Sequence, residues 1–188
     1  MKTEGEQVGT IITPPETKDF PQMMEIERFS FNMPWTESEF VRALFTRNVS
    51  CVLLKSTSLF RQDSVFGYVF YCTERKRLDV WNLAVRSDRR RRGHGTRLIA
   101  YLKERAERGI RKTLEAVISE QNLIGHLFFR AGGFRATEVL RDHYGEDHDA
   151  YRMVWDSMPF YRNRLFGGRR ATNFLDSTGG AATGEGVG

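Results

Sequence analysis

The 188-residue sequence has only two cysteines, Cys51 and Cys72. They lie in unrelated contexts, without a CxxC pair or the Cys/His spacing of a metal site, so we expect neither a disulfide scaffold nor bound metal. The sequence also lacks an apolar run near the roughly 20 residues of a membrane helix, and its polar N-terminus lacks a basic-then-apolar signal pattern. These absences predict a soluble cytoplasmic protein with no membrane partner.

The charge of the chain is uneven. The formal net charge is +5, and five arginines fall within residues 86–92. Such a run is either a solvated surface or an anion site, and the anion is either nucleic acid or a phosphorylated cofactor. The residues that follow the run decide between these interpretations.

The two ends of the chain differ in composition from its middle. Residues 1–18 are polar, contain Pro14-Pro15 and show no periodicity, which predicts a flexible N-terminal arm. Residues 165–188 are rich in Gly, Ala and Thr and bury too little apolar surface to offset their ordering entropy, which predicts a disordered tail. The length fits a single folded domain, which we place at residues 19–164.

The middle of the chain predicts an α+β domain. A helical pattern starts at Phe20, and a second helix follows Trp35, with Thr36 as N-cap, Glu39 closing a capping box and Trp35 packing on Phe40. Further helices are predicted at residues 96–108 and 122–131, and strands at 49–54, 65–72, 78–85, 113–119, 134–141 and 150–155. This order predicts one central sheet, mixed and mostly antiparallel, flanked by helices, two of which act as crossovers. We expect Trp81 and Trp155, at strand positions, in the core.

The arginine run continues into Arg90-x-x-Gly93-x-Gly95, between the strand at 78–85 and the helix that opens at Thr96. Two glycines let backbone amides turn toward an oxyanion, the helix adds its positive N-terminal end, and arginines add charge-assisted contacts. The pattern lacks the Gly-Lys-Ser/Thr of a Walker loop and the third glycine of a dinucleotide fingerprint. It therefore predicts a different kind of phosphate site.

At this point the sequence resembles a family. Leu83-Ala84-Val85 followed by Arg90-x-x-Gly93-x-Gly95-Thr96 is similar to the signature of the GNAT N-acetyltransferases, and the resemblance covers residues 26–155. It extends to Asn122, Phe128-Phe129-x-x-Gly132-Gly133-Phe134 and His148-Asp149-Ala150-Tyr151-x-Met153. Within the family the chain resembles the ribosomal-protein-alanine N-terminal acetyltransferases, through Phe31-x-x-Pro34-Trp35-x-x-x-x-Phe40, Tyr144 and Asp149-Ala150.

The resemblance implies transfer of an acetyl group from acetyl-CoA to a primary amine, here a protein N-terminal α-amine. It also implies roles for individual positions. Backbone groups of Leu83, Ala84 and Val85 and the side chain of Asn122 are expected to bind the pantetheine arm, and Phe129 to pack beside the thioester. The pyrophosphate is expected at Arg90, Arg91, Arg92, Gly93, His94, Gly95 and Thr96. The amine substrate is expected between Pro34-Trp35 and His143-Tyr144.

The acid–base pair of the resembled subfamily is missing from this sequence. Its glutamate and tyrosine positions correspond to Val117 and Phe129, and neither side chain exchanges a proton. Neither cysteine lies in a triad context, so we expect direct transfer without a covalent intermediate, in which positioning of the two reactants supplies much of the rate.

Three other side chains are candidates for the proton transfers. Asp79 lies on the strand where the resembled histone acetyltransferases place their base, Glu115 shares a strand face with Val117, and Tyr144 lies in the substrate hairpin with His143. The alternatives are that Asp79 pairs with an arginine, that Glu115 is a solvated strand end and that Tyr144 is a wall of the substrate site. Catalysis by positioning alone, with water as proton acceptor, also stays open.

Three other functions compete with this interpretation. A nucleic-acid-binding module would use the arginine run, but the run has no interleaved aromatic residues for base stacking. A non-catalytic acyl-CoA-binding protein of the same fold would explain the missing acid and base. A small-molecule amine, such as an aminoglycoside, would replace the protein N-terminus as acceptor. The acidic segment at residues 145–149 is either an attractor for a cationic amine or a solvated turn, and the oligomeric state is not predicted.

Overall fold

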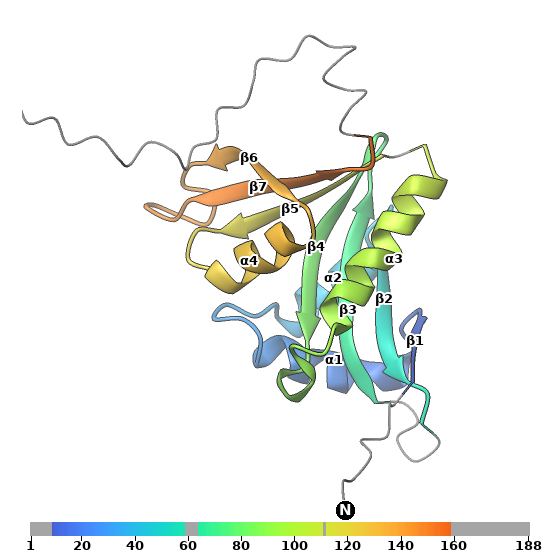
Figure 1. Ribbon diagram of the computed structural model, residues 1–188. Helices are drawn as coiled ribbons and strands as arrows, with labels where there is room; N and C mark the ends of the chain where they lie inside the picture. Colours follow the sequence, from blue (N-terminus) through green and yellow to red (C-terminus); the bar gives the residue numbers. More distant parts are fainter. Residues whose placement is uncertain (1–8, 59–63, 111, 159–188) are drawn as a thin grey trace, which may run out of the picture. The chain divides into compact units, whose positions relative to one another are not determined.

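The computed structural model describes residues 9–58, 64–110 and 112–158, whose strands form one sheet in the order β1-β2-β3-β4-β5-β7-β6 (Figure 1). The strands are β1 (Thr10–Thr13), β2 (Val49–Ser56), β3 (Val65–Thr73), β4 (Arg77–Val85), β5 (Thr113–Ser119), β6 (Arg135–Leu140) and β7 (Ala150–Asp156). The helices are α1 (Phe20–Arg28), α2 (Glu37–Phe45), α3 (His94–Arg108) and α4 (Leu123–Ala131), with 3-10 turns at Thr17–Asp19 and Ser87–Arg89.

The sheet is mixed, as the sequence predicts. Strands β1 to β4 pair antiparallel in succession, β4 and β5 pair parallel, and β7 pairs antiparallel with both β5 and β6. Helix α3 connects the parallel strands β4 and β5, and α4 connects β5 to β6 with β7 inserted between them. The α+β fold and both predicted crossovers are therefore confirmed.

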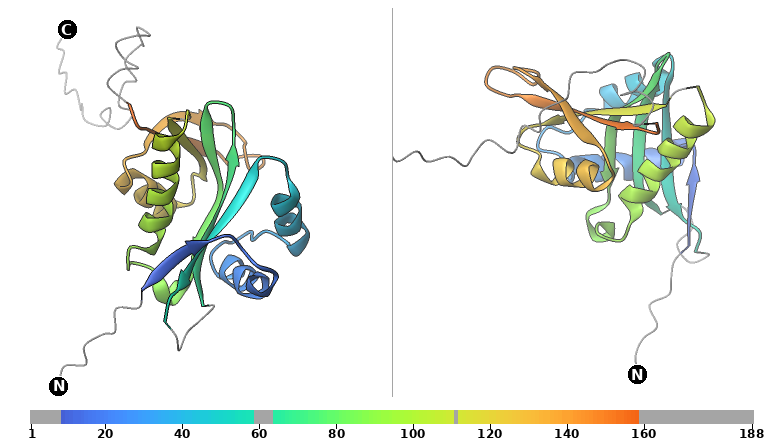
Figure 2. Two further views of the ribbon diagram at one scale, coloured as in Figure 1. Left: turned by 90° about the vertical axis from the view of Figure 1, so that its right-hand side faces the viewer. Right: turned by 45° about the horizontal axis from the view of Figure 1, so that its top comes forward.

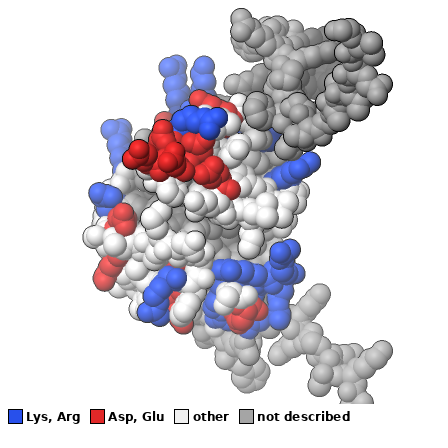
Figure 3. All heavy atoms as spheres, turned by 90° about the vertical axis from the view of Figure 1, so that its left-hand side faces the viewer, with Lys and Arg blue, Asp and Glu red and all other residues white. Residues whose placement is uncertain are grey.

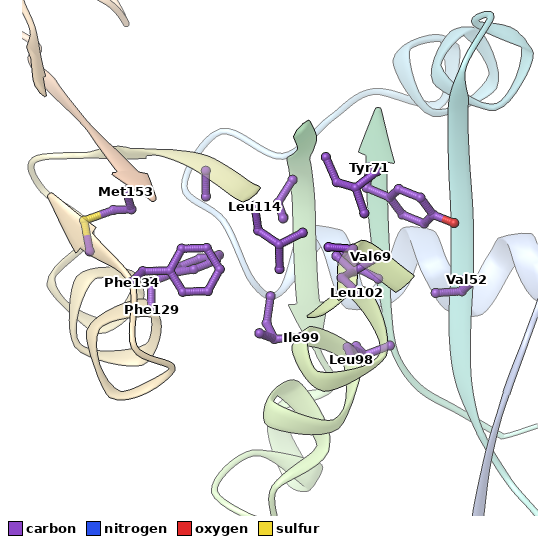
Figure 4. Packing of buried hydrophobic residues seen from close by; sticks show 14 of the residues in the cluster. Val52, Val69, Tyr71, Leu98, Ile99, Leu102, Leu114, Phe129, Phe134 and Met153 are labelled. Atoms are coloured by element: carbon purple, nitrogen blue, oxygen red, sulfur yellow. The ribbon is translucent and has the colours of Figure 1, made fainter. Parts of the chain in front are cut away.

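Helices cover both faces of the sheet. In the views of Figure 2, α1 and α2 lie on one face and α3 and α4 on the other. Helix α3 turns Leu98, Ile99 and Leu102 onto the sheet, and each is at most 4% exposed (Figure 4). Burying an aliphatic side chain of this size stabilises the fold by about 1.5–3 kcal/mol. The 3.6-residue periodicity read from the sequence thus predicts the buried face of α3 correctly.

The start of α2 also follows the prediction. The amide of Glu39 donates to the Thr36 hydroxyl, and the amide of Thr36 donates to the Glu39 carboxylate, which completes the capping box. The ring of Trp35 packs edge-on against Phe40, at a centroid distance of 5.6 Å. Phe40 is fully buried between α2 and the sheet, so this contact fixes the chain that enters α2.

The N-terminal arm is the first correction. Thr10–Thr13, expected in a flexible arm, form β1 at the edge of the sheet, and Arg97 of α3 donates hydrogen bonds to the hydroxyl and carbonyl of Thr10. The sequence Thr-Ile-Ile-Thr does not alternate between polar and apolar residues, which is why the pattern missed β1. The rest of the arm, residues 1–8, the domain end at 164 and the tail at 165–188 lie outside the described residues.

Trp81 is the second correction. We expected it in the core, but 45% of its surface is exposed. The register of β3 and β4 shifts here, because Phe70 pairs with Asn82 and Tyr71 with Val80, so Trp81 is an extra residue in a β-bulge. A bulge breaks the alternation of faces on which the prediction rested. Trp155, by contrast, packs against the core as expected.

Candidate active site

Strands β4 and β5 pair along only part of their length. The last parallel pair joins Val80 to Ala116, just before the bulge at Trp81. Residues 83–85 of β4 therefore lie beyond the paired region, where no described strand covers the β5 side. The two strands thus split apart at residues 83–85, whose backbone groups the resemblance led us to expect at the pantetheine arm.

The arginine–glycine loop turns from this end of β4 into α3. Gly93 is the N-cap of α3 and has φ +79°, a left-handed conformation that glycine adopts without strain. Gly95 has a different function, because a Cβ there would lie 3.0 Å from the ring of Phe128 on α4. The first glycine makes the turn, and the second permits the close approach of α4.

Three arginines of the run are held by the protein itself. Arg86 and Arg89 form ion pairs with Asp88, and both guanidinium groups lie over the ring of Phe66. Arg90 donates to the carbonyl of Val85 and to the hydroxyl of Ser30. Arg90, expected at the pyrophosphate, thus connects the loop to the end of β4 and to the segment after α1.

The remaining arginines of the run, Arg91 and Arg92, are exposed, and within the described chain neither makes a side-chain hydrogen bond or ion pair. They stand beside the first turn of α3, which includes His94, Gly95 and Thr96 and whose amides carry the partial positive charge of the helix end. Burial, together with the charges of Arg89, Arg92 and Arg97, lowers the pKa of His94. The loop thus combines free cationic side chains, helix amides and a histidine that stays neutral at pH 7.

Tyr144 lies at the opposite side of the split. Its hydroxyl donates a long hydrogen bond (3.4 Å) to the carbonyl of Val117, the residue of β5 directly after the last pair with β4. The ring of His143 packs edge-on against Tyr144. Burial raises the pKa of Tyr144, so its hydroxyl remains protonated through the physiological range. The structure thus puts a proton-bearing group where β4 and β5 separate.

The two candidate carboxylates are bound by arginines. Asp79 accepts a hydrogen bond from Arg77 at 2.6 Å, and Glu115 accepts one from Arg152 at 3.0 Å and lies 3.5 Å from Arg77. Arg152 also binds Glu138, so the ion pairs cross β4, β5, β7 and β6. These contacts raise the pKa of both arginines. The alternative that Asp79 pairs with an arginine is what the structure shows, and Glu115 is paired as well.

The positions of the family's acid and base are apolar here, as the sequence indicates. Val117 is half-buried, and Phe129 is only 5% exposed, packed edge-on between Phe128 and Phe134. Asn122, expected to bind pantetheine, uses its Oδ1 to cap α4 by accepting from the amide of Gly125. Cap and ligand contact are compatible, because the cap uses only one end of the side-chain amide.

The segment between α1 and α2 forms the expected substrate side. Pro34 and Trp35 belong to it, and the ring of Trp35 is anchored on Phe40 and Phe70. Its backbone is anchored too, because the amide of Trp35 donates to the carboxylate of Glu27 on α1 at 2.7 Å. Ser30, bound by Arg90, fastens the other end of the segment to the arginine–glycine loop.

Glu27 is a residue that sequence reasoning missed. It is 1% exposed and accepts hydrogen bonds from Tyr68 of β3 and Asn82 of β4 as well as from Trp35. Burial and the neighbouring carboxylate raise the pKa of Tyr68. The available signal was a glutamate at the helical spacing of the buried positions Met23 and Ile26, where an apolar residue is the norm.

Charged side chains frame the surface of Figure 3. Acidic side chains gather in one patch near the top with basic ones around it, and further basic side chains lie near the bottom, with mostly uncharged surface between. The exposed acidic residues of the β6–β7 loop are Asp142, Glu146 and Asp147, and the arginine–glycine loop supplies basic ones.

Within residues 9–58, 64–110 and 112–158, the acidic, cysteine and histidine side chains form no group of three that would hold a metal ion. None of the helices in these ranges has the length and apolar character that crossing a membrane requires.

Comparison with solved structures gives many matches. The ribosomal-protein-S18-alanine N-acetyltransferase from Escherichia coli is 22% identical with a TM-score of 0.65, over 79% of this chain and 94% of that one. Ard1 from Thermoplasma volcanium is 18% identical (TM-score 0.68; 79% and 98% of the chains), and Arabidopsis thaliana NAA60 with acetyl-CoA is 14% identical (TM-score 0.67; 79% and 98%). These likenesses show a shared fold.

The family is shown by sequence. No curated protein matches the chain. Residues 20–134, however, match the model of the acetyltransferase (GNAT) family, which is more than half of the chain and includes the split strands and the arginine–glycine loop. The chain therefore belongs to the GNAT acetyltransferases, and acetyl-CoA is its cosubstrate.

Proposed function

We propose that this acetyltransferase acts on the α-amine of a protein N-terminus, as the ribosomal-protein-alanine type does. The proposal depends mainly on one observation, that none of the candidate carboxylates near the split between β4 and β5 is free to act as a base. Val117 and Phe129 replace the usual acid–base pair, while Asp79 and Glu115 are bound by arginines. The similar fold of the ribosomal-protein-S18-alanine N-acetyltransferase supports the same substrate class.

The missing base favours an α-amine on physical grounds. An amine attacks a thioester only as the free base, and an α-amine has a pKa of about 7.7–8.0 against about 10.4 for a lysine side chain. At neutral pH the fraction of free base is therefore several hundredfold larger for an α-amine than for a lysine side chain. A site without a dedicated base transfers acetyl groups efficiently only to amines that deprotonate on their own, with water as proton acceptor.

The cofactor is held mainly by the arginine–glycine loop in this proposal. The pyrophosphate is bound by the side chains of Arg91 and Arg92 and by the amides at Gly93, His94, Gly95 and Thr96. Arg90 keeps the loop in place. Backbone groups of Leu83, Ala84 and Val85 and the amide of Asn122 bind the pantetheine arm. This arrangement directs the thioester into the split between β4 and β5.

Tyr144 is the catalytic residue we assign, while Asp79 and Glu115 stabilise the sheet. The amine nitrogen forms a bond to the thioester carbonyl carbon, the carbon–sulfur bond breaks, and the proton released by the amine ends on the coenzyme A sulfur by way of water. The hydroxyl of Tyr144 stays protonated and donates a hydrogen bond to the negative charge that develops in this step. His143 orients the Tyr144 ring from its edge.

A turnover screen tests the acceptor. Purified enzyme with acetyl-CoA is assayed against a peptide with a free N-terminal alanine, the same peptide with a blocked N-terminus and an internal lysine, spermidine and an aminoglycoside. We expect turnover only with the free α-amine. Preference for any other amine overturns the proposed substrate, and acetyl-CoA that raises the melting temperature without any turnover identifies a non-catalytic binding protein.

The remaining alternatives have their own readouts. Retention on RNA at low salt, without any thermal shift from acetyl-CoA, would favour the nucleic-acid-binding module. The proposed location is the cytoplasm, because Cys51 and Cys72 are both free and burial raises the pKa of both thiols, as expected of unreactive cysteines in a reducing compartment.

A further inference from the structure

The carboxylate of Glu27 lies buried at the junction of α1, β3, β4 and the segment before α2. Its Oε1 accepts from the Trp35 amide at 2.7 Å, both of its oxygens lie 3.2 Å from the Asn82 side-chain nitrogen, and the Tyr68 hydroxyl donates to Oε2. Among the described residues its partners are all neutral donors. A buried carboxylate without a cation is costly, and apolar replacements of buried charges are often as stable, so fold stability alone does not explain this residue.

The partners of Glu27 belong to two sides of the proposed acceptor site. Trp35 ends the segment that joins α1 to α2, and its ring is already fixed on Phe40 and Phe70. Asn82 directly follows the bulge that exposes Trp81, at the point where β4 leaves β5. The carboxylate therefore sets the distance between the acceptor-side segment and the bulged strand.

The opposite end of the same segment is held by a different contact. The hydroxyl of Ser30 accepts from Arg90, which also binds the carbonyl of Val85. The segment is thus tied to the cofactor loop near α1 and to the bulged strand, through Glu27, near α2. Removing the Glu27 contact would loosen the acceptor side and leave the cofactor side in place.

We propose that Glu27 is a positioning residue for the amine substrate, which holds the segment around Pro34-Trp35 against β4 at Asn82. The inference rests on the proposed transfer to a protein N-terminus. It assigns Glu27 no proton transfer, since the residue is too buried to touch the acceptor. Its effect is on acceptor binding and alignment, and acetyl-CoA binding is independent of it.

The decisive variant is Glu27→Met, which keeps the side-chain length and removes the acceptor atoms. We expect a KM for the alanine peptide raised about tenfold, as for one lost hydrogen bond of ordinary strength, with KM for acetyl-CoA and its thermal shift unchanged. Glu27→Gln should restore most of the parent KM. Its Oε1 still accepts from the Trp35 amide, and its side-chain NH2 can donate to the oxygen of Asn82 once the Asn82 amide has rotated. Glu25→Met, on the exposed side of α1, is the matched control and should keep the parent KM.

Two kinetic outcomes overturn the proposal: a parent-like peptide KM in Glu27→Met, and a rise of both KM values together, which would indicate general damage. If Glu27→Met does not fold, Asn82→Ser removes the strand end of the same contact and carries the same expectation. Hydrogen exchange gives a readout that needs no acceptor, since Glu27→Met should speed exchange across residues 29–36 and a parent-like rate would refute the positioning role. If the parent enzyme does not acetylate the alanine peptide, the proposed function is refuted but the role of Glu27 is not. The exchange measurement then decides whether Glu27 positions the segment.

Discussion

The two sides of the split between β4 and β5 are built on different principles. The proposed cofactor side consists of one continuous stretch, β4 into α3, in which Gly93 and Gly95 set the backbone and the amides are the proposed ligands of the pyrophosphate. The acceptor side is assembled from side chains of distant segments, including Glu27, Asn82 and Tyr144. The cofactor side requires glycine at two positions, because Gly93 has a left-handed backbone and Gly95 leaves room for Phe128. A side built on side chains can instead change its acceptor, or lose its acid and base, through single substitutions.

The largest effect is expected on acetyl-CoA binding when the charges of Arg91 and Arg92 are reversed. Arg91→Glu with Arg92→Glu should raise KM for acetyl-CoA on the order of a hundredfold, because each charge-assisted hydrogen bond contributes about 1.5–3 kcal/mol. Steady-state kinetics with a fixed peptide concentration measures it. The same charge change at Arg42 and Arg47, on and after α2, serves as control. Equal losses in both double variants would mean that overall charge, and not this loop, binds the cofactor.

Tyr144→Phe tests the acceptor side. We expect kcat to fall on the order of tenfold to a hundredfold, because a hydrogen-bond donor to developing charge is lost, with KM for acetyl-CoA unchanged. Since burial raises the pKa of Tyr144, the parent should keep its activity up to at least about pH 10 before this group ionises. Tyr101→Phe on α3 is the control, and an unchanged kcat in Tyr144→Phe would remove Tyr144 from the mechanism.

The two loop glycines should respond differently to alanine. Gly93→Ala forces a Cβ into a left-handed conformation that costs about 1–2 kcal/mol, so KM for acetyl-CoA should rise up to about tenfold. Gly95→Ala instead meets the Phe128 ring, and Phe128→Leu in the same chain should relieve it, while leaving Gly93→Ala unimproved. Melting temperatures and acetyl-CoA titrations of the four variants measure this. Rescue of Gly93→Ala by Phe128→Leu would contradict the two separate functions of the glycines.

The smallest effect is expected at the paired carboxylates. Asp79→Asn and Glu115→Gln should each leave kcat within about threefold of the parent and lower stability by at most about 1 kcal/mol, as partly exposed ion pairs do. Chemical denaturation and initial rates measure the two quantities. A loss of kcat in either variant larger than that of Tyr144→Phe would identify that carboxylate as the base and break the comparison drawn above.

The conformation of the arginine–glycine loop was predictable because its signal is local. Leu83 to Thr96 carry it in consecutive residues, and Gly93 does adopt the conformation for which a glycine is needed. Helix faces and the capping box at Thr36 were predictable for the same reason. The role of Arg90 was not, since its partner Ser30 lies 60 residues away.

The acceptor side depends on packing that no short pattern encodes. The side chains of Glu27 and Asn82 come into contact only when α1 packs on the sheet. Trp81 is exposed because of a β-bulge, which a prediction from regular strand alternation does not include. Asp79 pairs with Arg77 two residues before it, whereas the pairing of Glu115 depends on Arg152, which lies 37 residues away on the neighbouring strand β7. Sequence patterns therefore identify candidate groups on this side, and contacts decide which of them are free to react.

The central claim, that the enzyme supplies no base of its own, is tested most directly by the pH dependence of kcat/KM for the free N-terminal peptide. We expect the acid limb to follow the pKa of the acceptor α-amine, about 7.7–8.0, and to move with it when peptides of different α-amine pKa are compared. Asp79→Asn and Glu115→Gln should leave this limb in place. A limb that stays fixed while the acceptor pKa changes, and that disappears in one of these variants, would contradict the claim.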